Sequence, residues 1–323
     1  MNIYDIADKA GVSIATVSRV LNHSPKVSPK TYARVMTVID ASGYVATSSI
    51  IFKKIAILCS TILNTENAYI CENLMSRFKA QGIDAALHIC GNNPADKKNT
   101  VNKCLDEKAS AFIIIGSDFL EYDSEDNSYL VMAARKVPVF IAGGYLEGSG
   151  IYCAFYDFEN AVHVLVDELT KRGRLHPLFV FPDMSQKCMN MLEGYRSACA
   201  HNKLGLSAEY SHLCKYGDAG KYLESLYSSN LSFDAIIASD DRLAIEATSY
   251  LMSKNISVPS DVEIIGCGNS MYADQFRPSL SSIAGDGLEI CDYIYKSILN
   301  FSRDTVSTRT IFSAGLIKRD SSL

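Results

Sequence analysis

With 323 residues, the chain is too long for one ordinary hydrophobic core, so two or three domains are expected. Hydrophobic residues make up 48% and charged residues 21%, as in soluble globular proteins, and no apolar run is long enough to span a membrane. The net charge of −5 excludes a protein that is basic over its whole surface. The charge is uneven, however: residues 1–54 hold seven Lys or Arg against three acidic residues, which leaves −9 for the remainder. A basic head on an acidic body is typical of a DNA-binding domain attached to a separate regulatory body.

Residues 3–22 are expected to form two short helices joined by a tight turn. Apolar residues recur from Ile3 to Ala10 at the spacing of one helical face. Gly11 follows where a helix end favours a left-handed residue, and Ser13 can cap a second helix over residues 14–22. This arrangement is the helix-turn-helix motif, whose second helix enters the major groove of DNA.

The outward face of the second helix carries the residues that we expect to contact DNA. Ile14 and Ala15 can touch thymine methyl groups, and Arg19 can bind a guanine edge through two hydrogen bonds. The candidate DNA-binding residues are Ser13, Ile14, Ala15, Thr16, Ser18, Arg19 and Asn22. On this pattern alone, the alternative is a helical hairpin with a solvated outer face.

A third helix is expected from Pro29 to Gly43, with Ser28 as its cap. The stretch IYDIADKAGVSIATVSRVLNHSPKVSPKTYARVMTVIDASGY resembles the N-terminal DNA-binding domain of the LacI/GalR family, the lac and galactose repressors. The AGVSxxTVSRVLN core and the VSPxTxxRV segment match the family closely. The resemblance implies sequence-specific binding of double-stranded DNA by residues 1–45.

Residues 46–53 link this head to the body, and here the chain departs from the family. Relatives carry a longer segment with an Ala-Arg-x-Leu run, which forms a hinge helix and inserts a leucine into the minor groove. That run is missing here. Either Ile50, Ile51 or Phe52 supplies the apolar wedge, or these residues simply begin the first strand of the body.

From Lys54 onward, short apolar runs alternate with helical stretches, which predicts parallel sheets covered by helices on both faces. Two such sets indicate two similar subdomains, and ligands of such folds bind beyond the carboxyl ends of the strands. The expected strands are 54–58, 85–90, 111–115, 139–142, 178–181, 235–238 and 262–267. The expected helices lie near 67–81, 98–108, 125–136, 158–172, 186–201, 240–255 and 287–301.

The body resembles the same family in FYDFENAVHVLVDELTKRG, in FDAIIASDDRLAIEATSYLMSKNISVPSDVEIIGCGNS and in TIFSAGLIKRDSS. The resemblance implies a small all-α helix-turn-helix head plus an α/β periplasmic-binding-protein-like body of two doubly wound parallel-sheet subdomains with three crossovers. We assign residues 54–157 and 286–306 to the first subdomain, and residues 158–285 and 307–323 to the second.

Neither catalytic nor metal-binding patterns are found. The sequence contains no Gly-x-Ser-x-Gly, His-Glu-x-x-His, Walker lysine loop or Gly-x-Gly-x-x-Gly. The ten cysteines are scattered through apolar runs without a Cys-x-x-Cys pair, which indicates buried thiols in a reducing compartment. No signal peptide is seen, because the first expected helix begins almost at residue 1. We therefore expect a cytoplasmic protein that is not an enzyme and that has no cofactor and no metal.

Relatives of this family hold a sugar effector with an arginine and an aspartate. The corresponding positions here are Met191 and Gly268, with Asn269 beside the latter, so both polar clamps are absent. Either the effector is not a simple sugar or the cleft no longer binds one. The candidate effector-binding residues are Tyr69, Ser117, Asp118, Lys187, Met191, Asp240, Gly268 and Asn269. For Tyr69 the alternative is packing on its own helix, and for Asp240 it is capping of the following helix.

The resemblance predicts a nucleoid-associated transcription regulator, a repressor, that binds a palindromic operator. A homodimer is expected because one helix-turn-helix contacts only half of a site. A small-molecule effector, such as a sugar or another metabolite, would bind in the body. The alternatives are a constitutive or protein-regulated DNA binder with a vestigial cleft and, less consistent with the head, a solute-binding protein.

Overall fold

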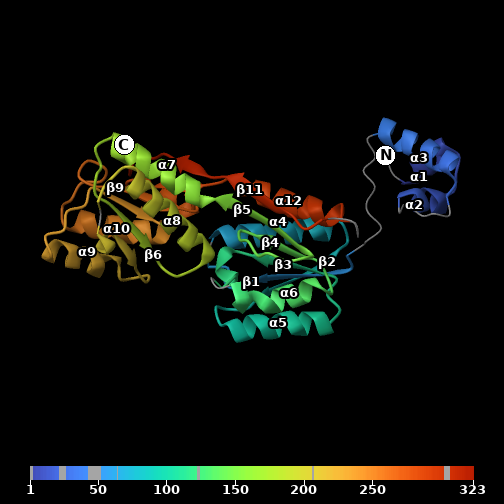
Figure 1. Ribbon diagram of the computed structural model, residues 1–323, viewed down its shortest axis with the longest axis horizontal. Coiled ribbons are helices and arrows are strands. Elements are labelled where there is room, and N and C mark those ends of the chain that lie inside the picture. The colour runs from blue at the N-terminus through green and yellow to red at the C-terminus, as the bar shows by residue number, and fades with distance from the viewer. Residues whose placement is uncertain are drawn as a thin grey trace.

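The computed structural model describes residues 3–21, 27–42, 52–63, 65–121, 124–205, 207–301 and 306–323. A small helical head precedes a body of two α/β subdomains (Figure 1). Across these described residues, no helix is long and apolar enough to cross a membrane. All ten cysteines are buried and free, as the sequence predicts.

The head consists of α1 (Ile3–Ala10), α2 (Ile14–Leu21) and α3 (Pro29–Ser42). Gly11 adopts a φ of 59° between the first two helices, a conformation that few other residues accept. The Thr16 N–H donates to Ser13 Oγ at 3.2 Å, so Ser13 caps α2 as predicted. Side chains of all three helices form the small core: Ile6, Ala7, Ala10, Val17, Val20, Val35 and Ile39.

The first subdomain contains a six-stranded sheet of order β11-β5-β4-β3-β1-β2, in which all neighbouring strands are parallel. Its strands are β1 (Lys54–Cys59), β2 (Asp84–Ile89), β3 (Ala111–Ile115), β4 (Val139–Ala142), β5 (Ile151–Asp157) and β11 (Arg309–Ser313). Apolar side chains of α4 (Thr65–Ala80) and α12 (Leu288–Leu299) pack on one face, and those of α5 (Pro94–Asp106) and α6 (Ser128–Ala134) on the other. Burial on both faces explains the continuous apolar runs of these strands.

The second subdomain repeats this plan with the order β12-β10-β9-β8-β6-β7, in which only the β10–β12 pair is antiparallel. Its strands are β6 (Pro177–Phe181), β7 (Ser211–Leu213), β8 (Ala235–Ala238), β9 (Glu263–Cys267), β10 (Ser281–Ala284) and β12 (Gly315–Ile317). The helices are α7 (Phe158–Lys171), α8 (Gln186–His201), α9 (Ala219–Ser228), α10 (Asp241–Ser253) and α11 (Met271–Gln275).

The chain passes between the two sheets three times: from β5 to α7, from β10 to α12 and from β11 to β12. The second passage contains Gly285, where a Cβ atom would overlap the ring of Tyr156. The Tyr156 hydroxyl accepts a hydrogen bond from the Gly287 N–H at 2.8 Å. The passages are therefore closely packed, and glycine at position 285 is a steric requirement.

Two predicted features need correction. Residues 307–323 do not all belong to the second subdomain, because Arg309–Ser313 pairs with β5 at the edge of the first sheet. Phe52 is not an exposed wedge: its side chain is buried in the core of the first subdomain, with its ring centroid 5.4 Å from that of Phe301. Ile50 and Ile51 lie outside the described residues.

Candidate functional site

The exposed side of α2 is the candidate DNA-contact surface. Val17 and Val20 of this helix are fully buried in the head, whereas Ser13, Ala15 and Arg19 are exposed. Ile14 keeps 40% of its surface exposed. The structure therefore places these predicted contacts on one accessible surface; the Ser18 side chain and Asn22 lie outside the described part.

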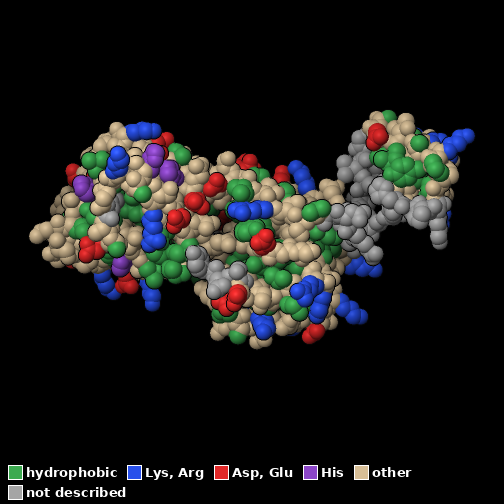
Figure 2. All heavy atoms as spheres, viewed as in Figure 1, with side chains coloured by type: hydrophobic (Ala, Val, Ile, Leu, Met, Phe, Trp, Pro, Cys, Tyr) green, Lys and Arg blue, Asp and Glu red, His purple; other side chains and the backbone are tan. Residues whose placement is uncertain are grey.

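Exposed basic residues lie on the other two helices of the head, α1 and α3. Lys9, Lys30 and Arg34 are all exposed, and Figure 2 shows Lys and Arg side chains at the surface of the head. Exposed cations of this kind contact phosphates and add affinity without base specificity. The head thus combines a helix face suited to base edges with exposed basic side chains on its other helices.

A second candidate site is a cavity of about 70 Å³ between the two subdomains. Its walls come from the segments that follow the carboxyl ends of β3, β4, β6 and β8, together with the first turns of α4 and α8. In parallel α/β sheets this is where ligands bind. Of the predicted effector residues, Ser117, Asp118, Lys187 and Asp240 line this cavity.

The other four predicted effector residues lie elsewhere. Met191 is fully buried in the apolar core that α8 forms with its neighbours. Asn269 donates its N–H to Ser282 Oγ at 2.9 Å and accepts from Arg319 at 2.6 Å, which keeps it and Gly268 away from the cavity wall. Tyr69 is 45% exposed on α4 and is not part of the wall. Effector contact by these four residues stays a prediction, and the lining of this cavity gives it no support.

Asp118 is held in place on the first-subdomain side. Its Oδ1 accepts a hydrogen bond from Asn67 Nδ2 at 3.2 Å, and its main-chain carbonyl accepts from Ser60 Oγ at 3.1 Å. Burial raises the pKa of the Asp118 carboxyl, an effect that the Asn67 hydrogen bond opposes. A carboxylate fixed in this way is preorganised for a ligand.

A buried lysine that the sequence reasoning missed supports the Asp118 turn. Lys97 is 1% exposed, and its Nζ donates to the carbonyls of Asp118 at 3.1 Å and Phe119 at 2.9 Å. It also forms an ion pair with Glu121 at 2.9 Å. No local pattern reveals this residue, because α5 is polar and its partners follow β3, about 20 residues further on.

Asp240 lies opposite, in the second subdomain. Its Oδ1 accepts from the Leu243 N–H at 2.8 Å as the N-cap of α10, and its Oδ2 accepts from the Tyr216 hydroxyl. Burial raises the pKa of Asp240. Capping and cavity lining were posed as alternatives for Asp240, and the structure shows both.

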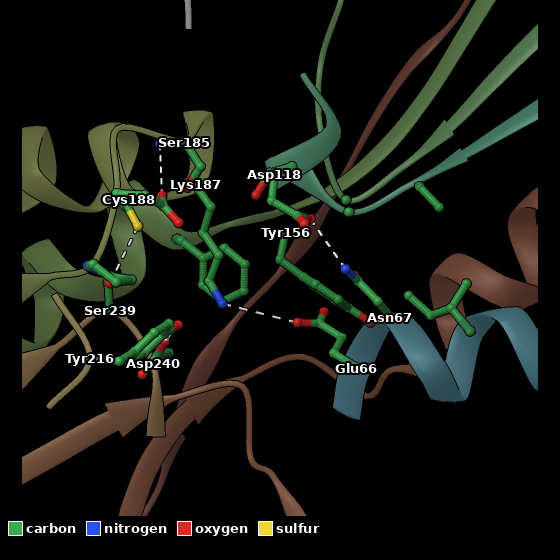
Figure 3. Close-up of a pocket in the computed structure, with 18 residues that line it drawn as sticks. Glu66, Asn67, Asp118, Tyr156, Ser185, Lys187, Cys188, Tyr216, Ser239 and Asp240 are labelled. Atoms are coloured by element: carbon green, nitrogen blue, oxygen red, sulfur yellow. Dashed lines mark hydrogen bonds and ion pairs between the residues drawn. The ribbon is translucent and has the colours of Figure 1, made fainter. Parts of the chain in front are cut away.

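Lys187 spans the cleft. It extends from α8 toward Glu66 of α4 with an Nζ–Oε2 distance of 4.0 Å, and its Nζ lies 4.8 Å from the centroid of the Phe158 ring (Figure 3). Burial opposes its charge, but the neighbouring acidic groups, Cys267, Glu66 and Asp240 among them, raise the pKa of the ammonium. Lys187 therefore stays charged and contacts both subdomains.

Gln186, the residue before it, makes a second contact across the cleft. Its side chain accepts from the Tyr145 N–H at 2.6 Å and donates to the Tyr145 carbonyl at 2.8 Å. The first two residues of α8 thus hold the two subdomains together in this conformation.

The cysteine of the cavity wall, Cys188, is not an activated nucleophile. The Cys188 thiol donates to Ser239 Oγ at 3.3 Å, and burial raises its pKa to about 12, so it is protonated at neutral pH. No histidine lines the cavity within the described part of the chain. Within the same described residues, no group of three or more His, Cys, Asp or Glu is arranged to hold a metal ion.

Comparison with known proteins gives the family. Residues 2–46 match the sequence model of "Bacterial regulatory proteins, lacI family", and residues 166–322 match that of a periplasmic binding protein-like domain. An HTH-type transcriptional regulator of Lachnoclostridium phytofermentans is 33% identical over 99% of this chain and 98% of its own length. The chain belongs to the lacI family.

Solved structures of regulators share the lacI-family fold. The lac repressor dimer bound to operator and the anti-inducer ONPF superposes with a TM-score of 0.73 at 18% identity, over 99% of this chain and 98% of that one. A complex of the regulator CelR with cellobiose gives 0.71 at 20% identity, over 99% of both chains. The helical head and the two-subdomain body are thus the fold that the resemblance implied.

Proposed function

We propose that this lacI-family protein is a transcriptional repressor that binds a palindromic operator as a homodimer and is regulated by a small molecule in the cleft. The observation that carries the proposal is the exposed face of α2, with Ile14 and Arg19, on a head joined to a two-subdomain body. A helix-turn-helix of this kind places its second helix in the major groove. Such a protein acts in the cytoplasm, at the nucleoid.

The first subdomain offers a surface for the partner protomer. Strand β2 forms an edge of its sheet, and an open groove lies between this strand and α4. Large apolar side chains are exposed on the same subdomain, Leu63 by 90%, Ile89 by 56% and Ile62 by 43%. An exposed sheet edge with apolar neighbours favours association, and a second copy of the chain would bury it.

Regulation would act through the angle between the subdomains. The Glu66–Lys187 and Gln186–Tyr145 contacts must break if the cleft opens for a ligand. If the two protomers also contact each other through their second subdomains, a change in the angle would move the first subdomains, and with them the Phe52 attachment points of the two heads. Ligand binding and operator binding would then be linked.

One observation favours the alternative of a DNA binder without an effector. The cavity of about 70 Å³ is small beside the roughly 300–1,000 Å³ of typical ligand pockets, and Lys187 extends into it. Thermal unfolding of the protein with a metabolite library separates the two possibilities. Stabilisation by a metabolite supports an effector, and no shift with any compound supports the alternative.

Selection of operators from random DNA tests the central function. The purified full-length protein should enrich a two-fold symmetric sequence with half-sites about one helical turn apart. Enrichment of no motif, or of an unrepeated motif only, would contradict the proposal. The binding should weaken steeply with salt, because phosphate contacts release counterions.

A further inference from the structure

The cleft carries an imbalance of charge. Four carboxylates and one ammonium line it: Glu66, Asp118, Asp183, Asp240 and Lys187. Among the described residues of the wall there is no further Lys, Arg or His. Lys187 lies beside Glu66, and Lys97, which lies behind the wall next to Asp118, is paired with Glu121 at 2.9 Å, so the carboxylates still outnumber the cations.

The aspartates come from opposite sides of the cleft. Asp118 belongs to the first subdomain, whereas Asp183 and Asp240 belong to the second. Burial raises the pKa of Asp118; hydrogen bonding by Asn67 and the charge of Lys97 oppose this effect, and the nearby Asp183 adds to it. Closing the cleft without another cation therefore brings like charges together where water is largely excluded.

Lys187 shows how this cleft accommodates an ammonium group. Its Nζ lies between a carboxylate, Glu66 at 4.0 Å, and an aromatic face, Phe158 at 4.8 Å. The same two kinds of group line the rest of the cavity, where Tyr156 and Tyr216 accompany the aspartates (Figure 3). A carboxylate combined with an aromatic face is a favourable environment for an organic cation.

We propose that the effector of this cleft is an organic amine whose ammonium group lies between Asp118 and Asp240. This inference rests on the proposed function of the cleft as an effector site. The cation supplied by the ligand would offset the repulsion across the cleft, so binding and closure would be coupled. The wall contains no arginine for an anion, and the described residues contain no cluster suited to a metal ion.

The two carboxylates are fixed before a ligand arrives. Asn67 orients Asp118, while the α10 N-terminus and the Tyr216 hydroxyl orient Asp240. The small volume of the cavity favours a compact amine in the conformation seen here. Diamines and amino sugars are the classes to test, because each has a neutral counterpart of nearly equal size.

Isothermal titration calorimetry on the full-length protein with matched probes tests the proposal. The probes are 1,4-diaminobutane against 1,4-butanediol, and glucosamine against glucose. In at least one pair the amine should bind at least about tenfold more tightly than its neutral counterpart. Asp118→Asn should weaken binding of that amine by about tenfold or more, whereas Asp96→Asn, on the exposed surface of α5, should not change it.

Asp118→Asn keeps an oxygen that can accept from Asn67, so this variant should fold, and its unfolding temperature verifies that. The proposal is overturned if both amines fail to bind, if the neutral probes bind as tightly, or if magnesium or calcium chloride alone binds in their place. Operator binding is measured on the same samples. Intact operator binding by the amine-free wild type together with failure to bind either amine refutes this inference alone, whereas no operator binding by the amine-free wild type refutes the proposed function.

Discussion

We propose that base recognition depends most on Arg19. It is exposed on α2 beside Ile14, in the position from which a guanidinium can reach a guanine edge. The signals that identify this part of the chain are local: the Ser13 cap, the Gly11 turn and the helical spacing lie within twenty residues. For that reason the head was predictable from the sequence.

Replacing Arg19 by alanine should cost about 1–3 kcal/mol of operator binding and relax the preference at one base pair per half-site. Fluorescence anisotropy with a set of operators substituted at single positions measures both effects. Lys171→Ala, on the exposed end of α7, serves as the control and should leave affinity and preference unchanged. An Arg19→Ala variant with unchanged base preference would show that α2 is placed incorrectly on DNA.

Replacing Lys97 should lower the free energy of unfolding far more than replacing Lys98, the next residue of the same helix. In Lys97→Met the Glu121 carboxylate and two buried carbonyls lose their donor, which should cost about 3 kcal/mol of unfolding free energy. Lys98 is exposed on the same helix, so Lys98→Met should change stability little. Urea unfolding of the two variants makes the comparison, and equal stabilities would contradict the buried network.

Only some of the residues that line the cleft could be predicted from the sequence. Ser117, Asp118, Lys187 and Asp240 were found because they follow strands or begin helices at the ligand-binding edge of a parallel sheet. Glu66, Asp183 and Tyr216 were missed because only the folded topology brings them to the same cavity. Met191 does not line the cavity, because its side chain is fully buried in an apolar core.

At the scale of elements, the body strands that were predicted are all present, and β5, β7, β10, β11 and β12 were missed. Strands β7, β11 and β12 are edge strands with partial exposure, so their apolar signal is weak. Strands β5 and β10 are buried inside their sheets; β10 is only four residues long and begins with two serines, whereas β5 runs directly into α7 without a turn signal. Strand β11 joins the first sheet by pairing with β5, which lies about 150 residues earlier in the chain. No local pattern contains that information.

The second subdomain depends on one buried carboxylate. Glu263 on β9 is fully buried and accepts hydrogen bonds from Arg172 at 2.8 Å, Arg174 at 3.1 Å and the Leu323 N–H at 3.0 Å. Burial opposes its ionisation, but these donors lower the pKa of Glu263 below its ordinary value. The ionised carboxylate therefore contributes its full stabilisation at pH values above the pKa of glutamate in the unfolded chain. This stabilisation is lost as the pH falls through the lower pKa that Glu263 has in the folded protein.

Glu263→Gln should lower the unfolding free energy at pH 7 by about 1–3 kcal/mol, because the partly exposed guanidinium groups of Arg172 and Arg174 lose their charged acceptor. The difference between wild type and variant should shrink as pH falls below about 4, the ordinary range of glutamate. Urea unfolding at a series of pH values measures this. A difference that stays constant or grows in acid would contradict the role assigned to this carboxylate.

The passage from β10 to α12 should tolerate no side chain at position 285. Gly285→Ala places a methyl group in the ring of Tyr156 and should cost about 1–3 kcal/mol through overpacking. Gly315, at the third passage, has no atom within 4 Å of the corresponding Cβ position, so Gly315→Ala is the matched control. Thermal unfolding compares them, and equal stability of the two variants would show that Tyr156 moves without cost.

At the scale of the whole molecule, a basic head is joined to an acidic two-subdomain body, and the two parts have different proposed functions. We propose that the head binds DNA through α2, and that the body provides a surface for a second copy and a cleft whose ligand changes the angle between the subdomains. Membership in the lacI family and 33% identity to a transcriptional regulator over nearly the whole chain support this division. The linker, which lacks the Ala-Arg-x-Leu run, requires that the two heads be positioned mainly by the dimeric body.

The most direct test of that account is the affinity of the full-length protein for a selected palindrome, for the same DNA with one half-site scrambled, and for DNA with both scrambled. Titration by fluorescence anisotropy at physiological salt should give two chains per palindrome and an affinity about a thousandfold above that for fully scrambled DNA. Scrambling one half-site should remove most of that preference. Equal affinity for the three DNAs, or one chain bound per palindrome, would contradict a symmetric repressor.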